Sequence, residues 1–166
     1  MTHHLNRFLQ VLLLLGGLTA CSGNRPAIPD QLPPLRLVIA NGPALETADP
    51  SGKAVLLNVW SSTCAVCLKE MPLLQKVHDT YKDRGLRVIA LAMPYDRPSD
   101  AVELSERNQW TFHVAIDPQG HANKALGSIR VTPTTLLFDA TGRRVWQHTG
   151  ELTADLLNAA LAKVIQ

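Results

Sequence analysis

Two cysteines, Cys64 and Cys67, are separated by two residues and follow an almost continuous apolar stretch at residues 54–60. Thiols at this spacing can close a disulfide or bind a metal. After the pair, apolar side chains recur at steps of three and four residues: Met71, Leu74, Val77 and Tyr81. This period predicts a helix, and the apolar stretch predicts a buried strand. The order strand, tight turn, helix places Cys64 at the N-terminus of the helix.

That position favours thiol chemistry. The first turn of a helix carries unpaired N–H groups and the positive end of the helix dipole, and both stabilise an anion such as a thiolate. A stabilised thiolate is a more populated nucleophile and a better leaving group. Cys67 lies one turn further on and should be less exposed, so it can attack a mixed disulfide on Cys64 without competing for substrate. The pair is predicted to cycle between dithiol and disulfide.

Glu70 and Pro133 are two further candidates for residues of the functional site. Glu70 lies three residues after Cys67 and therefore on the same side of the helix. Alternatively, Glu70 is an ordinary solvated residue in the first turns of the helix, where its negative charge is favourable to the helix dipole. Pro133 precedes the apolar run at residues 134–138, where a proline often begins a strand, and the sequence does not fix the isomer of its peptide bond. The sequence pattern alone does not decide whether either residue belongs to the functional site.

The elements around the cysteines predict an α/β domain. Strands at residues 54–60 and 86–93, joined by the helix that ends near Gly85, should form a right-handed crossover. We further expect an edge strand at 35–40, a helix at 99–108 capped by Ser99 or Asp100, a strand at 112–116, a short helix at 122–126, a hairpin of 134–138 with 144–148, and a closing helix at 153–165. The closing helix should direct Leu156, Leu157, Ala160, Leu161 and Val164 inward.

The N-terminal residues 1–20 have the form of a targeting segment. A weakly basic start precedes an apolar core of eleven residues, 8–18, which is too short to span a bilayer. The end of this segment, Leu18-Thr19-Ala20-Cys21, resembles the bacterial lipobox, which implies cleavage before a lipidated Cys21. An ordinary secretory signal with an incidental cysteine is the alternative. Residues 21–34 would then form a proline-rich tether, and 35–166 the folded domain.

Composition excludes some classes of protein. The chain has 166 residues, 46% hydrophobic and 18% charged, which fits one globular domain with a short extension. A formal net charge of +2 without a lysine or arginine cluster gives no electrostatic footprint for nucleic acid. Removing one of three cysteines by lipidation leaves an isolated pair, as suits an exported protein in an oxidising compartment.

Several short motifs, in this order and spacing, resemble the thioredoxin superfamily and more closely its TlpA-like, membrane-tethered bacterial branch. The matching residues are Asn58-Val59-Trp60, Cys64-x-x-Cys67, Glu70-Met71-Pro72, residues 131–136 and Asp139-x-x-Gly142. The resemblance covers residues 35–166. It implies a thioredoxin-like fold with a mixed central β-sheet flanked by helices on both faces, and thiol-disulfide oxidoreductase activity without a cofactor or metal.

The same resemblance implies roles for individual residues. Cys64 would be the nucleophile, Cys67 the resolving cysteine, Glu70 a proton relay or tuning group, Thr132 a substrate contact, and Pro133 a cis-proline beside the cysteines. We also expect Trp60 to be a core residue near the active site that takes part in substrate binding. Asn58 replaces a buried aspartate of thioredoxin itself, which gives more weight to Glu70. The partners would be exported proteins with a disulfide or dithiol, as in cytochrome c maturation, and an upstream thiol-disulfide electron donor. We expect a monomer, lipid-anchored and facing the periplasm; Ser22 after the lipidated cysteine favours the outer membrane.

Departures from the family pattern leave the direction of the reaction open. Thr63 stands where a tryptophan usually precedes the first cysteine, and the intervening dipeptide is Ala65-Val66, without a proline. That dipeptide is a main determinant of thiol acidity in the superfamily, so it sets the redox potential. The family favours the reducing direction.

Metal binding is the other use of such a pair. A structural zinc site needs four ligands, and the chain has no second cysteine pair. A copper-delivery module of the same fold is the alternative function. Such modules carry three residues between the cysteines and a histidine near the place of Pro133, whereas this chain has two residues and no histidine there.

Overall fold

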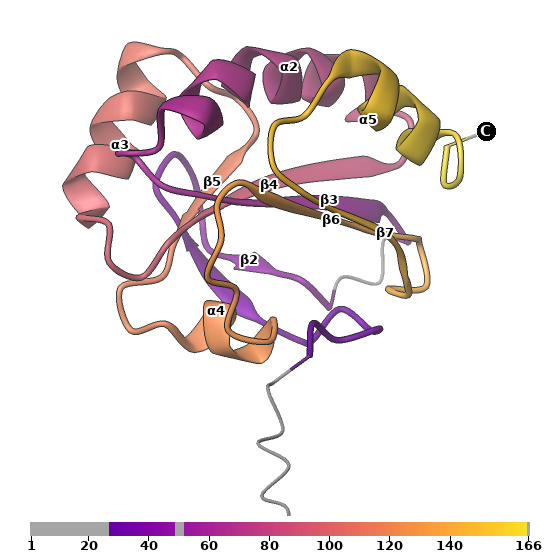
Figure 1. Ribbon diagram of the computed structural model, residues 1–166, viewed down its shortest axis with the longest axis horizontal. Helices are drawn as coiled ribbons and strands as arrows, with labels where there is room; N and C mark the ends of the chain where they lie inside the picture. The colour runs from indigo at the N-terminus through magenta and orange to yellow at the C-terminus, as the bar shows by residue number, and fades with distance from the viewer. Residues whose placement is uncertain (1–26, 49–51, 166) are drawn as a thin grey trace, which may run out of the picture.

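The computed structural model describes residues 27–48 and 52–165 (Figure 1). The expected targeting segment, Cys21 and Ser22 lie outside the described residues. The elements in chain order are β1 (Arg36–Ile39), β2 (Leu45–Glu46), β3 (Ala54–Trp60), α2 (Ala65–Tyr81), β4 (Leu86–Ala92), α3 (Pro98–Arg107), β5 (His113–Ile116), α4 (His121–Ala125), β6 (Thr134–Phe138), β7 (Arg144–Thr149) and α5 (Ala154–Leu161).

One mixed sheet of seven strands organises the domain, in the order β2-β1-β5-β4-β3-β6-β7. Strands β3, β4 and β5 run parallel, while β1, β6 and β7 join by antiparallel pairing. The predicted mixed sheet is therefore confirmed. The prediction that residues 35–40 form an edge strand is wrong, because the two-residue strand β2 pairs outside β1. Strand β2 is too short to show a strand pattern in the sequence, and a turn at Gly42 separates it from β1.

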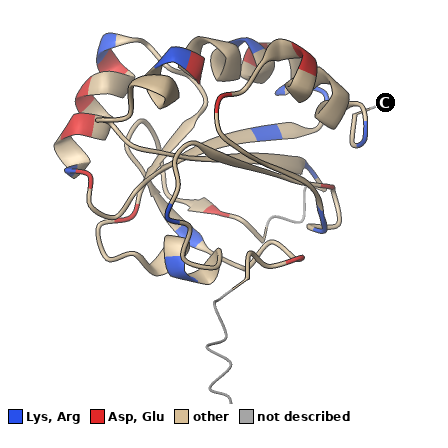
Figure 2. Cartoon of the chain, viewed as in Figure 1, with Lys and Arg blue, Asp and Glu red and all other residues tan. Residues whose placement is uncertain are grey.

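Helices cover both faces of the sheet, as predicted: α2, α3 and α5 lie on one face and α4 on the other (Figure 1). Strand β3 is buried along its whole length and its side chains alternate between two cores. Leu56 and Trp60 pack under α2, whereas Val55, Leu57 and Val59 pack on the α4 side. Charged residues lie mainly on the helices and turns (Figure 2). The strand that leads to the cysteines is thus fixed from both sides.

Helix α2 has the predicted apolar face, since Met71, Leu74 and Val77 are buried. The helix ends earlier than expected, with Lys82 as its C-cap. Gly85 adopts the left-handed conformation (φ 82°) in the turn that follows. Among the described residues, no helix is long and apolar enough to cross a membrane.

Two helix termini differ from prediction. Helix α3 begins at Pro98, whose fixed φ suits the first helical position, with Arg97 as N-cap and no side-chain cap bond. Asp100 is not a cap but pairs with Arg97, at 3.0 Å between Nη2 and Oδ1. In α5, Leu156 was expected inside but is 41% exposed, because the buried face of the helix runs through Leu157, Ala160 and Leu161.

Residues 27–34, which we expected to belong to a free tether, lie against the β6–β7 hairpin. The Leu32 amide donates to the Gly142 carbonyl at 2.8 Å, and the Arg144 amide donates to the Asp30 carbonyl at 2.7 Å. Arg144 also pairs with the Asp30 carboxylate at 2.6 Å. The packed domain therefore begins several residues before the predicted boundary at residue 35, because backbone pairing and the packing of Ile28 and Leu32 against the core hold this segment.

Candidate active site

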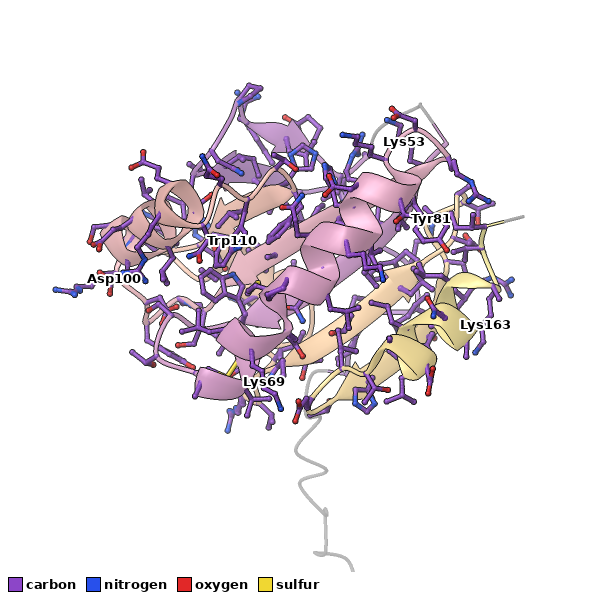
Figure 3. The ribbon with its side chains drawn as sticks, turned by 90° about the horizontal axis from the view of Figure 1, so that it is seen from above. Lys53, Lys69, Tyr81, Asp100, Trp110 and Lys163 are labelled. Carbon is purple, nitrogen blue, oxygen red and sulfur yellow. A yellow bond between two sulfur atoms is a disulfide. The ribbon has the colours of Figure 1, made fainter. Side chains whose placement is uncertain are left out.

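Cys64 lies where the sequence predicted, at the N-cap of α2, directly after the turn that follows β3. The Cys67 amide donates to Cys64 Sγ at 3.1 Å, and the two sulfurs form a disulfide. Figure 3 shows this bond beside the first turn of α2, near Lys69. Cys64 is half-buried, whereas Cys67 is completely buried. Cys64 keeps surface that solvent can reach, and Cys67 keeps none.

The turn before Cys64 is held by Asp96, which sequence reasoning missed. The Asp96 carboxylate accepts from Ser61 Oγ at 2.8 Å and from the Ser62 amide at 2.6 Å. The Cys64 amide in turn donates to the Ser61 carbonyl. Asp96 follows β4, which runs parallel beside β3, and the carboxyl ends of neighbouring parallel strands meet at one edge of a sheet. That topological rule is the signal that would have found it.

Glu70 is buried, with 3% of its surface exposed, so it is not the solvated helix residue that its position also allowed. Its Oε1 accepts from Asn58 Nδ2 at 2.8 Å, and its Oε2 accepts from the Leu152 amide at 3.0 Å. Burial raises the pKa of this carboxyl above its ordinary value, although the two hydrogen bonds act in the opposite direction. A carboxyl with a raised pKa lies closer to the range in which it can both accept and return a proton at neutral pH.

Asn58 connects this carboxyl to the neighbouring strand. Its Nδ2 also donates to Thr135 Oγ1 at 2.9 Å, while its Oδ1 is buried without a hydrogen-bond partner. All three groups, Asn58, Glu70 and Thr135, are almost fully buried. Outside them, Lys69 Nζ pairs with Glu151 Oε1 at 2.6 Å on the exposed side of the same helix turn. The backbone segment that donates to Glu70 is thus held to α2 at two points.

The Thr132–Pro133 bond is cis, and the proline is buried while Thr132 is half-buried. Strand β6 begins at the next residue and pairs antiparallel with β3, with Val59 opposite Thr134. Continuing that register sets Pro133 opposite Trp60, at the end of β3 from which the cysteine turn leaves. The structure therefore brings together Cys64, Cys67, Glu70 and the Thr132–Pro133 segment.

Trp60 does not belong to this surface. Its side chain is completely buried and meets Trp110 edge to face, with ring centroids 5.8 Å apart, while Trp110 stacks on Phe112. A side chain without exposed surface cannot contact a substrate, so the prediction of Trp60 as a substrate contact is wrong. An aromatic at the end of a strand covered on both faces belongs to the core.

No group of three or more histidine, cysteine or carboxylate side chains that could hold a metal occurs in the described ranges. A cysteine pair at a helix N-terminus, one sulfur accessible and one buried, beside a cis-proline and on a mixed sheet, defines a thioredoxin-fold protein with a redox dithiol.

The chain belongs to the Redoxin family, whose profile matches residues 27–164. It is 34% identical over 128 residues to "Thiol-disulfide oxidoreductase ResA" of Bacillus thuringiensis subsp. konkukian, covering 74% of this chain and 70% of that protein. Among solved structures, a putative thiol:disulfide interchange protein DsbE from Chlorobium tepidum matches with a TM-score of 0.71 and 28% identity, covering 81% of this chain and 94% of that one.

A putative thioredoxin from Neisseria meningitidis matches with a TM-score of 0.73 and 26% identity, covering 81% of this chain and 90% of that one. The predicted thioredoxin-like fold is confirmed, and the protein is a thiol-disulfide oxidoreductase. The copper-delivery alternative finds no support among these relatives.

Proposed function

We propose that the protein reduces disulfides of exported proteins, with Cys64 as nucleophile, Cys67 as resolving cysteine and Glu70 as the group that handles the resolving proton. The observation that carries this proposal is the asymmetry of the pair: Cys64 is half-buried at a helix N-cap and Cys67 is fully buried one turn on. The described structure is the oxidised state, with the pair closed.

The first step uses the accessible sulfur. In the reduced protein the Cys64 thiolate attacks one sulfur of the substrate disulfide, so a Cys64–substrate disulfide forms and the substrate disulfide breaks. The first substrate thiolate leaves and takes a proton from solvent. The Cys67 amide and the helix N-terminus stabilise the attacking thiolate. The half-buried backbone of Thr132 is proposed to pair with the substrate chain during this step.

The second step uses the buried sulfur. Cys67 loses its proton, attacks Cys64 Sγ and expels the second substrate thiolate, which restores the disulfide seen in the structure. Glu70, on the same buried face of α2, is proposed to accept the Cys67 proton, since no solvent reaches this sulfur. Glu70 then returns this proton to the departing second substrate thiolate. In total two electrons pass from Cys64 and Cys67 to the substrate, whose two thiols take one proton from solvent and one from Cys67 through Glu70. An upstream dithiol protein must then reduce the Cys64–Cys67 disulfide before the next cycle.

The location belongs to the same proposal. A lipidated Cys21 would hold the chain at the periplasmic face of a membrane, because buried acyl chains contribute about 0.8 kcal/mol per methylene. Ser22 favours the outer membrane, and residues 22–26 would span the distance to the packed segment that begins near Ile28. The chain would act as a monomer on exported proteins such as those of cytochrome c maturation.

The test is a single turnover by the pre-reduced full chain on a peptide disulfide. We expect one substrate disulfide to be reduced per chain, with the chain ending two mass units lighter as the Cys64–Cys67 disulfide. A chain that stays a dithiol while the substrate remains oxidised would contradict the proposal. Cleavage of the lipoprotein signal is tested separately, by mass spectrometry of the N-terminal peptide from membranes.

A further inference from the structure

Two hollows flank the loop that leads to Pro133, residues 127–132, which we call the docking loop. One hollow, of about 470 Å³, extends from the loop to Thr134 and Thr149. The other, of about 530 Å³, extends to Met93, Pro94 and Tyr95. Both are lined by the same three loop residues, Ser128, Ile129 and Arg130. The docking loop is therefore a ridge between two open spaces next to the redox site.

The docking loop is held in one shape from within the fold. Gly127 and Ser128 both adopt left-handed conformations, with φ of 89° and 55°. The Ser128 amide donates to the Asn123 carbonyl at 2.9 Å, and Asn123 Nδ2 donates to the Ile129 carbonyl at 3.1 Å. At the other end Thr134 Oγ1 donates to the Val131 carbonyl at 2.7 Å. A ligand that binds here meets a surface that is already ordered, which lowers the entropic cost of binding.

The backbone of the docking loop still offers hydrogen bonds. Among the described residues, the amides of Arg130, Val131 and Thr132 donate to no partner. Alternate amides of an extended chain face the same side, so those of Arg130 and Thr132 are the two that an added chain can join by main-chain pairing. The occupant that this backbone fits is therefore an extended polypeptide segment.

The side chains around the docking loop favour a particular charge on that segment. Arg130 is exposed and pairs with no carboxylate in the described part of the chain, and neither hollow is lined by an acidic residue. Its neighbours are apolar or neutral, and Val131 and Tyr95 are 58% and 65% exposed. An unopposed guanidinium above an apolar surface attracts a carboxylate and disfavours a cation.

Resting on the proposed reductase function, we infer that the docking loop selects substrate segments with an acidic side chain close to the reacting cysteine, through Arg130. A strand advances about 3.3 Å per residue, so a side chain two positions from a cysteine that pairs at Thr132 reaches about 7 Å along the loop, to Arg130. An acid two positions after the cysteine fits antiparallel pairing, and two positions before fits parallel pairing.

The experiment measures the rate constant for reduction of symmetric disulfide-linked peptide dimers by the pre-reduced full chain. Each peptide carries Glu, Gln or Lys two positions before or after its cysteine. In one of the two positions we expect the Glu peptide to react about five-fold faster than the Lys peptide, as one exposed ion pair allows. The preference should fade in about 1 M salt, which screens exposed charges.

Variants separate Arg130 from the intrinsic reactivity of the peptides. Arg130→Glu should reverse the order and Arg130→Gln should abolish it. Arg107→Glu on α3 serves as the matched control and should keep the wild-type order. Arg107 is also exposed, and its Nη1 lies 3.9 Å from Glu103 Oε1. An unchanged preference in both Arg130 variants, or a wild-type chain indifferent to charge in both positions, would overturn the inference.

A neutral reagent distinguishes this failure from failure of the proposed function. The wild-type chain and the Arg107→Glu control should reduce 4,4′-dithiodipyridine at the same rate, because this disulfide carries no charge and no backbone. The peptide rates of each Arg130 variant are divided by its own rate with this reagent. If the wild-type chain reduces the reagent and all peptides equally, Arg130 selects nothing and the reductase proposal stands. If the wild-type chain reduces neither the reagent nor any peptide, the reductase proposal itself fails.

Discussion

The two cysteines share one bond but lie in contrasting surroundings. Cys64 ends an exposed turn that Asp96 holds by two hydrogen bonds, and its sulfur receives one amide donor. Cys67 is covered completely and shares the buried face of α2 with Glu70, which Asn58 contacts in turn. The first site is polar and open, and the second is closed and shares its helix face with the Glu70 carboxyl.

This difference assigns each sulfur to the half of the reaction that its environment permits. Attack on a protein disulfide needs access, which only Cys64 has. Release of the product is intramolecular and needs no access, but its proton must go to a group inside the fold. The buried Glu70 carboxyl, with its raised pKa, is such a group.

The largest expected effect comes from breaking the pair itself. Cys64→Ser should abolish turnover and form no adduct, because the buried Cys67 cannot reach a substrate. Cys67→Ser should also abolish turnover but accumulate a Cys64–substrate disulfide, since the attack proceeds and the release does not. Non-reducing mass spectrometry of each variant after mixing with a peptide disulfide distinguishes them. Equal adducts on both variants would remove the contrast between the two sulfurs.

Glu70→Gln should slow turnover at pH 7 by about 100-fold or more, as expected for loss of a general base. The attack step should be little affected, so the mixed disulfide on Cys64 should become the longest-lived species in quenched-flow samples. Lys69→Gln, which removes the exposed ion pair on the neighbouring residue, is the control and should leave the rate unchanged. A slowed attack with normal release would assign Glu70 to the other sulfur.

The same carboxyl predicts how stability depends on pH. Since burial raises the folded-state pKa of Glu70 above the ordinary 4.5, the unfolded chain releases this proton first. Its contribution to stability is therefore present below about pH 4.5 and is lost as pH rises through the folded-state pKa. In thermal unfolding, the wild type should lose stability relative to Glu70→Gln between pH 4 and pH 7. A difference that is constant with pH would contradict the raised pKa.

Asn58→Leu should have a smaller effect on the rate than Glu70→Gln and a clear effect on the pH dependence of the rate. Losing the donor to Glu70 Oε1 removes a hydrogen bond that favours the charged carboxylate, so the pKa of Glu70 should rise further. The acid limb of the rate profile should then move to higher pH, and unfolding free energy should fall by about 1–3 kcal/mol. Thr135→Val, which breaks only the other contact of Asn58, should leave the profile in place.

Asp96→Asn tests the open side and should change the attack rate by only about two- to five-fold. The amide retains an acceptor for the Ser61–Ser62 turn but removes a negative charge near Cys64, so the thiolate should form at lower pH. Iodoacetamide alkylation of Cys64 against pH measures this shift. Asp100→Asn, whose carboxylate faces Arg97 instead, is the matched control.

The sequence predicted the parts of this site that local pattern determines. Cys64 and Cys67 stand out because the strand period changes to the helix period around them, and that change also fixed the β3–α2 junction. The expected burial of Cys67 is observed. The thioredoxin-like fold followed from several motifs in the right order.

Contacts between distant segments could not be predicted in the same way. Asp96 meets the cysteine turn only because β3 and β4 are parallel neighbours, and Leu152 meets Glu70 across 82 residues of sequence. The buried strand predicted at residues 54–60 already placed Trp60 in the core, and only its additional assignment as a substrate contact was wrong. Residues 30–32 pair with the hairpin through their backbone, which produces no apolar period in the sequence from which the pairing could be predicted.

The reduction potential of the Cys64–Cys67 pair tests the central claim, that this protein is a reductase, most directly. It is measured by equilibrating the full chain with glutathione and dithiothreitol buffers, with copper excluded, and counting free thiols. We predict a value near or below about −270 mV, at which the dithiol gives its electrons to strained or exposed disulfides of higher potential. A value between about −120 and −180 mV would identify an oxidant or isomerase and contradict the proposed direction.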